Sequence, residues 1–180
     1  MNNIYYFIRH AHSSYTPDEI NRPLSDKGQA SLAQLEFLTD KSIAAIYSSP
    51  YRRAIQTVEP LAQSLKLAIQ TDKRLIERKL SSQAIADQDF EQCLMQLWSQ
   101  PAFSLVDGES NQQAQQRALA LLHELESKHQ NEEIIISSHG NLICILLSAF
   151  DSRIDYNFWH NLPMPDVLIL DKNEKITRLL

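Results

Sequence analysis

The stretch Ile4-Tyr5-Tyr6-Phe7-Ile8-Arg9-His10 decides the fold, because an apolar run of strand length ends abruptly in two polar side chains. The pattern occurs twice more: Ala44–Tyr47 precedes Ser48-Ser49-Pro50, and Ile134–Ile136 precedes Ser137-Ser138-His139-Gly140. Short apolar runs bounded by polar residues are typical of parallel strands that are covered on both faces. The sequence therefore predicts three buried, parallel strands.

Helical patterns lie between these runs. Ser25 is placed to cap a helix that extends to about Leu38. A second pattern contains Pro60, so we expect that helix to kink or restart there; its apolar positions are Ala54, Val58, Leu61 and Leu65. A third, cleaner pattern consists of Ala114, Ala118, Leu121 and Leu125. Alternating strands and helices predict a three-layer α/β/α sandwich with a mostly parallel central sheet.

Two segments fit this alternation less well. Residues 78–106 are polar at both ends and contain one helical pattern, formed by Phe90, Leu94 and Leu97. We interpret this segment as a small helical insertion over the active site. Val167–Leu170 and Ile176–Leu180 predict a terminal hairpin or edge strands. A length of 180 residues fits one domain, 1–180.

Composition excludes several classes of function. The net charge of −5 argues against nucleic acid as a partner, because a phosphate backbone attracts basic surfaces. No segment approaches the ~20 apolar residues of a membrane helix, and the first residues do not form a secretion signal. Cys93 and Cys144 form no disulfide framework. The expectation is a cytoplasmic protein without a membrane partner.

With 3 glycines, the chain has neither a dinucleotide motif nor a P-loop.

The polar residues that follow the three runs suggest a common site. In open α/β sheets, ligands bind beyond the carboxyl ends of the strands. Arg9 with His10, Arg53, and His139 would meet at that edge. Arginine offers a planar fork of donors that matches phosphate oxygens, and histidine serves as nucleophile or acid–base group. A helix starting after Gly140 would add backbone N–H donors for an anion.

Longer motifs occur in a fixed order along the chain. They are Phe7-Ile8-Arg9-His10-Ala11, Leu24-Ser25-Asp26-Lys27-Gly28, Ser48-Ser49-Pro50-Tyr51-Arg52-Arg53-Ala54-Ile55-Gln56-Thr57, Arg74-Leu75-Ile76-Glu77, Gly108-Glu109-Ser110 with Arg117, and Ser138-His139-Gly140. In these motifs the chain resembles the histidine phosphatase superfamily, which includes the phosphoglycerate mutases. The resemblance covers most of the chain, from residue 7 to residue 140.

The resemblance implies a role for each matching residue. His10 would attack phosphorus and become phosphohistidine, with Glu77 as the acid that protonates the leaving oxygen. The resemblance assigns both catalytic and substrate-binding roles to Arg9, Arg53 and His139. It assigns substrate-binding roles alone to Gly140 and Ser13. The expected activity is metal-independent and cofactor-free hydrolysis of a small phosphorylated metabolite. The expected partner is that substrate. Whether the chain also forms a homodimer stays open.

Two departures from the family pattern bear on the activity. Ala11 replaces the usual glycine after the histidine, and Arg78-Lys79-Leu80-Ser81 replaces the frequent Gly-x-Trp-Glu-Gly after the acid. The insertion is shorter than in the mutases, which favours hydrolysis.

Two other functions remain open at this stage. Arg22–Gly28 resembles the short bacterial phosphohistidine protein phosphatases. A non-catalytic scaffold that binds phosphorylated ligands would need the arginines but not Glu77.

His12 forms a His-x-His pair with His10, but a metal-dependent (β/α)₈ barrel needs ~250 residues. His12 therefore either lines the substrate mouth or is solvated.

Overall fold

The computed structural model describes residues 1–180 and contains one six-stranded sheet in the order β3-β2-β4-β1-β5-β6. The strands are β1 (Ile4–Arg9), β2 (Ile43–Ser48), β3 (Ile69–Thr71), β4 (Glu133–Ser138), β5 (Asp166–Leu170) and β6 (Ile176–Arg178). The first four run parallel, and β5 and β6 are antiparallel to their neighbours. The predicted mostly parallel sheet is confirmed.

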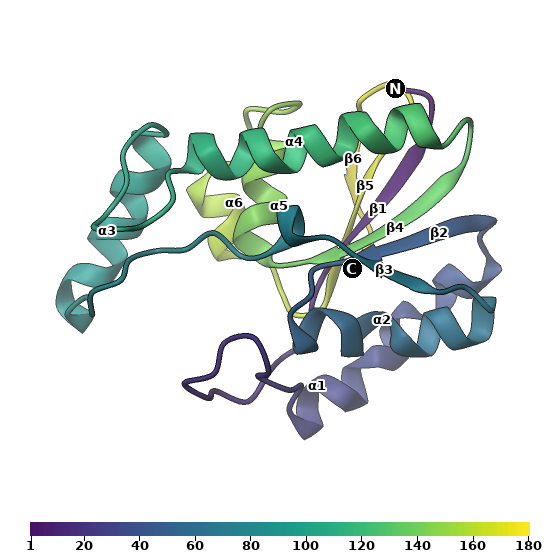
Figure 1. Ribbon diagram of the computed structural model, residues 1–180, viewed down its shortest axis with the longest axis horizontal. Coiled ribbons are helices and arrows are strands. Elements are labelled where there is room, and N and C mark those ends of the chain that lie inside the picture. Colours follow the sequence, from purple (N-terminus) through teal and green to yellow (C-terminus); the bar gives the residue numbers. More distant parts are fainter.

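Helices cover both faces of this sheet. They are α1 (Asp26–Ser31), α2 (Arg52–Leu65), α3 (Asp87–Ser99), α4 (Asn111–Lys128), α5 (Gly140–Leu147) and α6 (Tyr156–His160), with short 3₁₀ helices η1 (Leu32–Asp40) and η2 (Lys73–Leu75). Figure 1 shows α4 on one side of the sheet and α1 and α2 on the other. The three-layer arrangement is therefore confirmed. None of these helices has the combination of length and apolar character that a membrane span requires.

Strands β1, β2 and β4 are largely apolar because the sheet is covered on both faces at its centre. On β1, Tyr5 and Phe7 belong to the core cluster under α4 and α5, and Tyr6 and Ile8 belong to the cluster under α2 and η1. Neighbouring residues of a strand point to opposite faces of the sheet, so a strand with two helical layers needs apolar residues at every position. Continuous burial holds the carboxyl ends of the strands in a fixed register.

Two helices differ from the sequence-based expectation. The Ser25 hydroxyl accepts the backbone N–H of Gly28 at 3.1 Å, as a cap should, but the α-helix gives way to 3₁₀ geometry at Leu32. We expected the second helix either to kink or to restart at Pro60. A restart is wrong, since α2 runs as one helix through Pro60. Pro60 is exposed, so water can satisfy the carbonyl that loses its partner.

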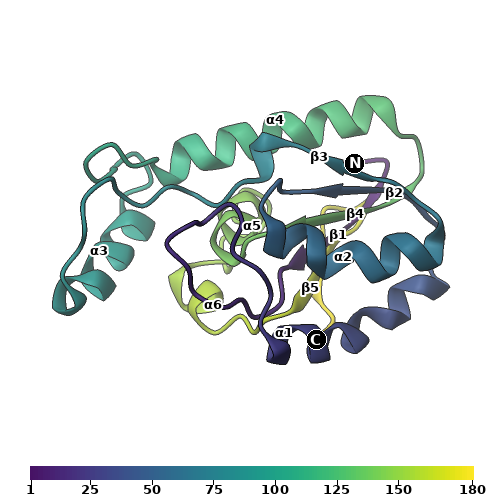
Figure 2. The same cartoon turned by 60° about the horizontal axis from the view of Figure 1, so that its bottom comes forward.

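The insertion and the chain end complete the molecule. Residues 78–106 contain α3, whose Leu94 and Leu97 are buried and whose Phe90 is exposed. Figures 1 and 2 place α3 at one end of the molecule, near α6, and its Trp98 stacks on Trp159 with 6.3 Å between ring centroids. The function of this segment as a cap remains a prediction. Strands β5 and β6 form the expected terminal hairpin; β3 and α6 were not foreseen.

Candidate active site

The register of the sheet brings the ends of three strands together. Arg9 at the end of β1 pairs with Ser138 on β4, and Ser48 on β2 pairs with Ser137. Backbone bonds extend this pairing beyond the strands: His10 N–H donates to the Ser138 carbonyl at 3.0 Å, and Ser49 N–H donates to the Ser137 carbonyl at 2.9 Å. The chain segments that carry His10, Ser49 and His139 are therefore held side by side.

His10 is a buried, neutral imidazole with a defined orientation. Its Nδ1 lies 2.7 Å from the Ala11 carbonyl oxygen, and its Nε2 lies 3.1 Å from Nε of Arg53. Because a carbonyl can only accept, the proton is on Nδ1 and the lone pair is on Nε2. Burial lowers the pKa of His10 to about 3, and the nearby charges of Arg53 and Arg9 act in the same direction. An unprotonated Nε2 is the atom that a phosphoryl transfer to histidine requires.

The backbone at His10 is braced by the start of α2. The Ala11 N–H donates to the Thr57 hydroxyl at 3.0 Å, and that hydroxyl donates to the Arg53 carbonyl at 2.7 Å. Ala11 itself is fully buried. The residue after the histidine is thus fixed through its amide, and its carbonyl in turn fixes the His10 ring.

His139 supplies a second imidazole to the same place. The centroids of the His10 and His139 rings are 5.2 Å apart, and the His139 Nε2 lies 2.9 Å from the Ser49 hydroxyl. The Nδ1 atom of His139 is buried and has no partner. Burial lowers the pKa of His139 well below its usual value, and His10 and Arg53 add to that effect. Both histidines are therefore neutral at neutral pH.

Two arginines flank the imidazoles. Arg53, on the first turn of α2, is 2% exposed, and its guanidinium lies 4.9 Å from the Tyr51 ring centroid. Arg9, at the end of β1, donates to the Leu162 carbonyl through Nη1, while its buried Nε has no partner. Arginine remains charged even when buried, so these side chains make the neutral imidazoles part of an electropositive site.

Gly140 allows Arg9 to lie where it does. A Cβ atom at Gly140 would lie 2.7 Å from the Arg9 Nε and 2.9 Å from its Cζ. Any other residue at this position would push the guanidinium away. We expected a backbone donor for an anion near Gly140, at the start of α5; the close approach of Arg9 is a further reason for glycine at this position.

Glu77 is held at the same edge by two backbone amides. Its Oε1 accepts the N–H of Arg78 at 2.8 Å and the N–H of Leu142, in the first turn of α5, at 3.1 Å. One helix donor that we expected to serve a substrate anion therefore holds the Glu77 carboxyl group instead. Burial raises the pKa of Glu77, opposed by its amide bonds and by the charges of Arg78 and Arg53. A raised pKa keeps a carboxylic acid protonated nearer to neutral pH, as a general acid needs.

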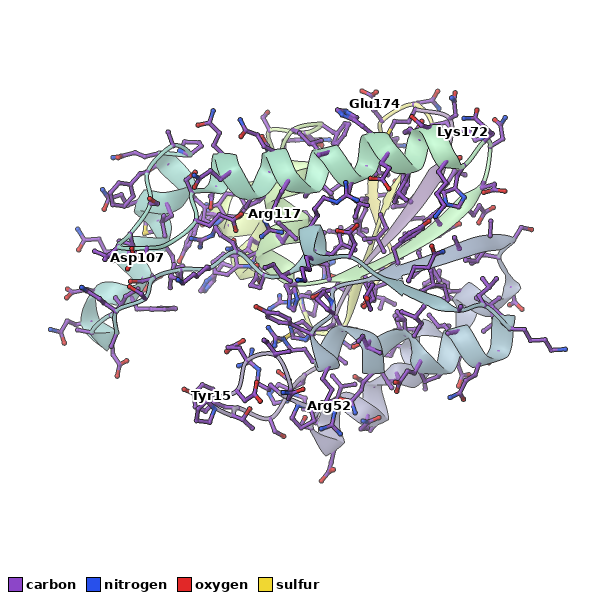
Figure 3. All side chains as sticks on the ribbon, in the orientation of Figure 1. Tyr15, Arg52, Asp107, Arg117, Lys172 and Glu174 are labelled. Carbon is purple, nitrogen blue, oxygen red and sulfur yellow. The ribbon has the colours of Figure 1, made fainter.

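The Gly-Glu-Ser motif supports the segment that precedes Glu77. Ser110 and Gln113 form a reciprocal capping box at the start of α4. Arg117 bonds both oxygens of Glu109, at 2.6 Å and 2.8 Å, and donates to the Arg74 carbonyl at 2.6 Å. Figure 3 shows Arg117 on the side of α4 that faces the sheet. The motif thus ties α4 to the η2 segment.

The predicted site residues are brought together with one exception. His10, Arg9, Arg53, His139, Gly140 and Glu77 form a single cluster. Ser13 instead pairs with Leu24 at the neck of a loop, and no hydrogen bond joins it to the cluster. His12 is exposed, with Nδ1 at 2.7 Å from the Ser25 hydroxyl.

Sequence reasoning missed the roles of Ser49, Thr57 and Glu19. Ser49 and Thr57 lie within a matched motif, which was a usable signal, but Glu19 lies in an irregular loop and has none. Glu19 bonds Arg53 through its carboxylate at 3.2 Å. A cavity of about 620 Å³ lies away from this cluster, between Trp98, Asn111 and Ile145. No group of three or more His, Cys, Asp and Glu side chains is arranged to hold a metal ion.

Comparison with known proteins agrees with this geometry. The family model described as "Histidine phosphatase superfamily (branch 1)" matches residues 5–171. The chain belongs to the histidine phosphatase superfamily. The relatives include a Hydrogenobacter thermophilus protein named "Putative phosphoserine phosphatase 2", 27% identical over 78% of this chain and 77% of its own length. Phosphoglycerate mutase-like protein 4 of Arabidopsis thaliana is 26% identical over 76% of this chain and 66% of its own length.

Solved structures share the fold. The mycobacterial glucosyl-3-phosphoglycerate phosphatase superposes with a TM-score of 0.76 at 21% identity, covering 92% of this chain and 88% of the other. YhfR of Bacillus stearothermophilus superposes with a TM-score of 0.79 at 23% identity, covering 99% of this chain and 96% of the other. This histidine phosphatase superfamily member therefore has phosphatases among its relatives and its structural neighbours.

Proposed function

We propose that the protein is a metal-independent phosphomonoesterase that transfers the phosphoryl group of a small metabolite first to His10 and then to water. The observation that carries this proposal is the state of His10. A protonated Nδ1 held by the Ala11 carbonyl leaves a lone pair on Nε2. A pKa of about 3 keeps that lone pair free of protons throughout the neutral range.

The proposed reaction has two steps that share one site. Nε2 of His10 forms a bond to phosphorus while the ester P–O bond breaks, and Glu77 gives its proton to the departing alcohol. Water then attacks the phosphohistidine, and the Glu77 carboxylate takes up a proton as the N–P bond breaks and phosphate leaves. Arg9, Arg53 and His139 stabilise the charge on the phosphoryl oxygens in both steps, since phosphoryl transfer depends on positioning and electrostatics.

A small phosphorylated metabolite is the substrate class that the site favours. An alcohol is a poor leaving group, so its ester needs the proton that the raised pKa of Glu77 keeps available. The printed names of a relative and of a structural neighbour, phosphoserine phosphatase and glucosyl-3-phosphoglycerate phosphatase, point to metabolites of this kind. The short 78–106 segment, with its single helix α3, supports hydrolysis over a mutase reaction.

A phosphohistidine protein is the second candidate substrate. The observation that favours it is the exposed apolar surface of the loop beside Arg53, where Tyr15 is 81% and Ile20 is 56% exposed. Large exposed apolar side chains are suited to contact another protein. Glu77 favours a phosphate ester as the substrate, because hydrolysis of a phosphohistidine releases an imidazole, which needs no such acid.

Hydrolysis of p-nitrophenyl phosphate in excess EDTA tests the proposal. Wild type and His10→Ala are compared from about pH 5 to pH 8, where an ordinary histidine titrates. We expect activity that survives chelation, disappears in the variant and accompanies an acid-labile, alkali-stable phosphoenzyme. Loss of activity on chelation would contradict the metal-free reaction. Phosphate binding without turnover of any ester would identify a scaffold, and turnover of a phosphohistidine protein alone would identify the second candidate.

A further inference from the structure

The guanidinium of Arg53 has a protein partner on every nitrogen. Its Nε donates to His10 Nε2 at 3.1 Å, and its Nη1 donates to the Glu19 carbonyl at 2.7 Å. Its Nη2 lies 3.2 Å from Oε2 of the Glu19 carboxylate, whose Oε1 is 3.1 Å from Arg22 Nη1. A carboxylate thus bridges two arginines beside the nucleophile, in the way that a phosphoryl group would bridge them.

Local structure delivers Glu19 to this place. The loop closes at its neck through the Ser13–Leu24 bridge. At its tip the Asp18 carboxylate accepts the N–H groups of Ile20 and Asn21, each at 3.1 Å. The Ile20 carbonyl then accepts the N–H of Arg52 at 2.8 Å, which docks the loop on the start of α2. Figure 1 shows this loop beside α1 and α2.

We infer that Glu19 is an affinity-setting residue, whose carboxylate occupies the edge of Arg53 that the substrate's phosphoryl group needs and is displaced when that group binds. The inference rests on the function proposed above, because it concerns the same site. Glu19 is the partner that moves, since its side chain is 52% exposed and that of Arg53 is 2% exposed. A dianionic phosphoryl group beside the carboxylate repels it, and water solvates the released charge.

Displacement of Glu19 has a consequence for the nucleophile. While Glu19 holds the two outer nitrogens of Arg53, the Nε–H of Arg53 covers the lone pair of His10. A phosphoryl group that replaces the Glu19 carboxylate bonds Arg53 through Nη2, turns the guanidinium toward itself and leaves that lone pair free to attack phosphorus. Arg22 is released by the same event, because it shares the Glu19 carboxylate. Binding of the phosphoryl group and exposure of Nε2 are therefore coupled.

Binding of inorganic phosphate by isothermal titration calorimetry tests the inference without turnover. Wild type, Glu19→Gln and Glu19→Ala are compared, with Glu59→Gln as the matched control that removes one exposed carboxylate from α2 away from Arg53. The bonds from the Arg53 guanidinium to the Glu19 carbonyl and from the Arg52 N–H to the Ile20 carbonyl do not involve the Glu19 side chain and remain in both variants. We expect phosphate to bind about fivefold or more tightly to both Glu19 variants and unchanged to the control.

Kinetics on p-nitrophenyl phosphate separate competition from positioning. If Glu19 competes with the phosphoryl group, its variants lower KM and keep kcat within about twofold of wild type. A lower kcat with unchanged KM overturns the inference, because Glu19 would then hold Arg53 in its active position. Unchanged phosphate affinity in an active enzyme also overturns it and leaves the proposed function intact. Absence of both phosphate binding and turnover in wild type and variants overturns the two proposals together.

Discussion

Replacing Gly140 by alanine puts a methyl group into space that the Arg9 side chain occupies. The new Cβ would lie 2.7 Å from Nε, 2.9 Å from Cζ and 3.0 Å from Cδ of Arg9, whereas ordinary contacts begin near 3.4 Å. Arg9 is held at its far end by the Leu162 carbonyl, so it cannot simply rotate outward. The guanidinium must therefore shift by about 0.7 Å or more to restore an ordinary van der Waals contact.

This shift should affect activity far more than stability. A displacement approaching 1 Å in a catalytic group costs roughly 10²-fold in rate, so we expect kcat/KM on p-nitrophenyl phosphate to fall by about that factor. Gly140 is the first residue of α5, where alanine is at least as favourable as glycine. The free energy of unfolding, measured by urea titration, should change by no more than about 1 kcal/mol.

A double-mutant cycle with Arg9→Ala isolates the cause. If the methyl group acts through Arg9, Gly140→Ala should have little further effect on kcat/KM in the Arg9→Ala background. An undiminished loss in that background would refute the reasoning, since the methyl group would then be acting on something else. A loss of folding stability as large as the loss of activity would refute it as well.

Three further predictions concern Glu77, His10 and Gly28. Glu77→Gln should lower kcat on an alkyl phosphate by roughly 10²–10⁴-fold but far less on p-nitrophenyl phosphate, whose leaving group needs no proton; equal losses on both would contradict its role as acid. The folded-state pKa of His10, about 3, lies below its unfolded value of about 6.5, so its contribution to stability is complete above pH ~6.5 and is lost as the pH falls. Urea titrations should show ~2 kcal/mol of that loss between pH 7 and pH 5, and less loss in His10→Asn; equal pH slopes would contradict this. Gly28→Ala should cost about 1–3 kcal/mol in urea titrations, because its Cβ would lie 2.0 Å from the His12 carbonyl oxygen, which is backbone; a neutral result would show that the loop neck yields.

Much of the fold could be predicted because the relevant patterns are local and strong. The runs at β1, β2 and β4 are apolar at nearly every position. Such a continuous apolar run is expected only for strands whose sheet is covered on both faces. The structure lengthens each run by one to three residues, mostly into polar positions such as Arg9 and Ser138, which pair within the sheet. Strand β3 escaped prediction because its 3 residues lie at an edge and are mostly exposed, so no apolar run marks it.

Most of the cluster around His10 could also be predicted. Residues that follow buried parallel strands lie at one edge of the sheet, so the sequence predicts that His10, Arg53 and His139 lie together. Ser13 did not join them, because its backbone is used at the neck of a loop. Glu19 could not be found at all, because its position depends on a loop path that is set by several weak bonds.

The sequence by itself determined the three buried parallel strands, the helices between them and the meeting of His10, Arg53 and His139 at one edge of the sheet. Periodicity and strand-end position are properties of neighbouring residues, and these suffice for such conclusions. Only the tertiary structure decided which nitrogen of His10 carries the proton, which amides hold Glu77 and which carboxylate covers Arg53. The Glu77 and Glu19 contacts join residues remote in the chain, and the His10 contact with its neighbour Ala11 depends on the orientation of the ring; in each case distances of about 3 Å decide whether a bond exists.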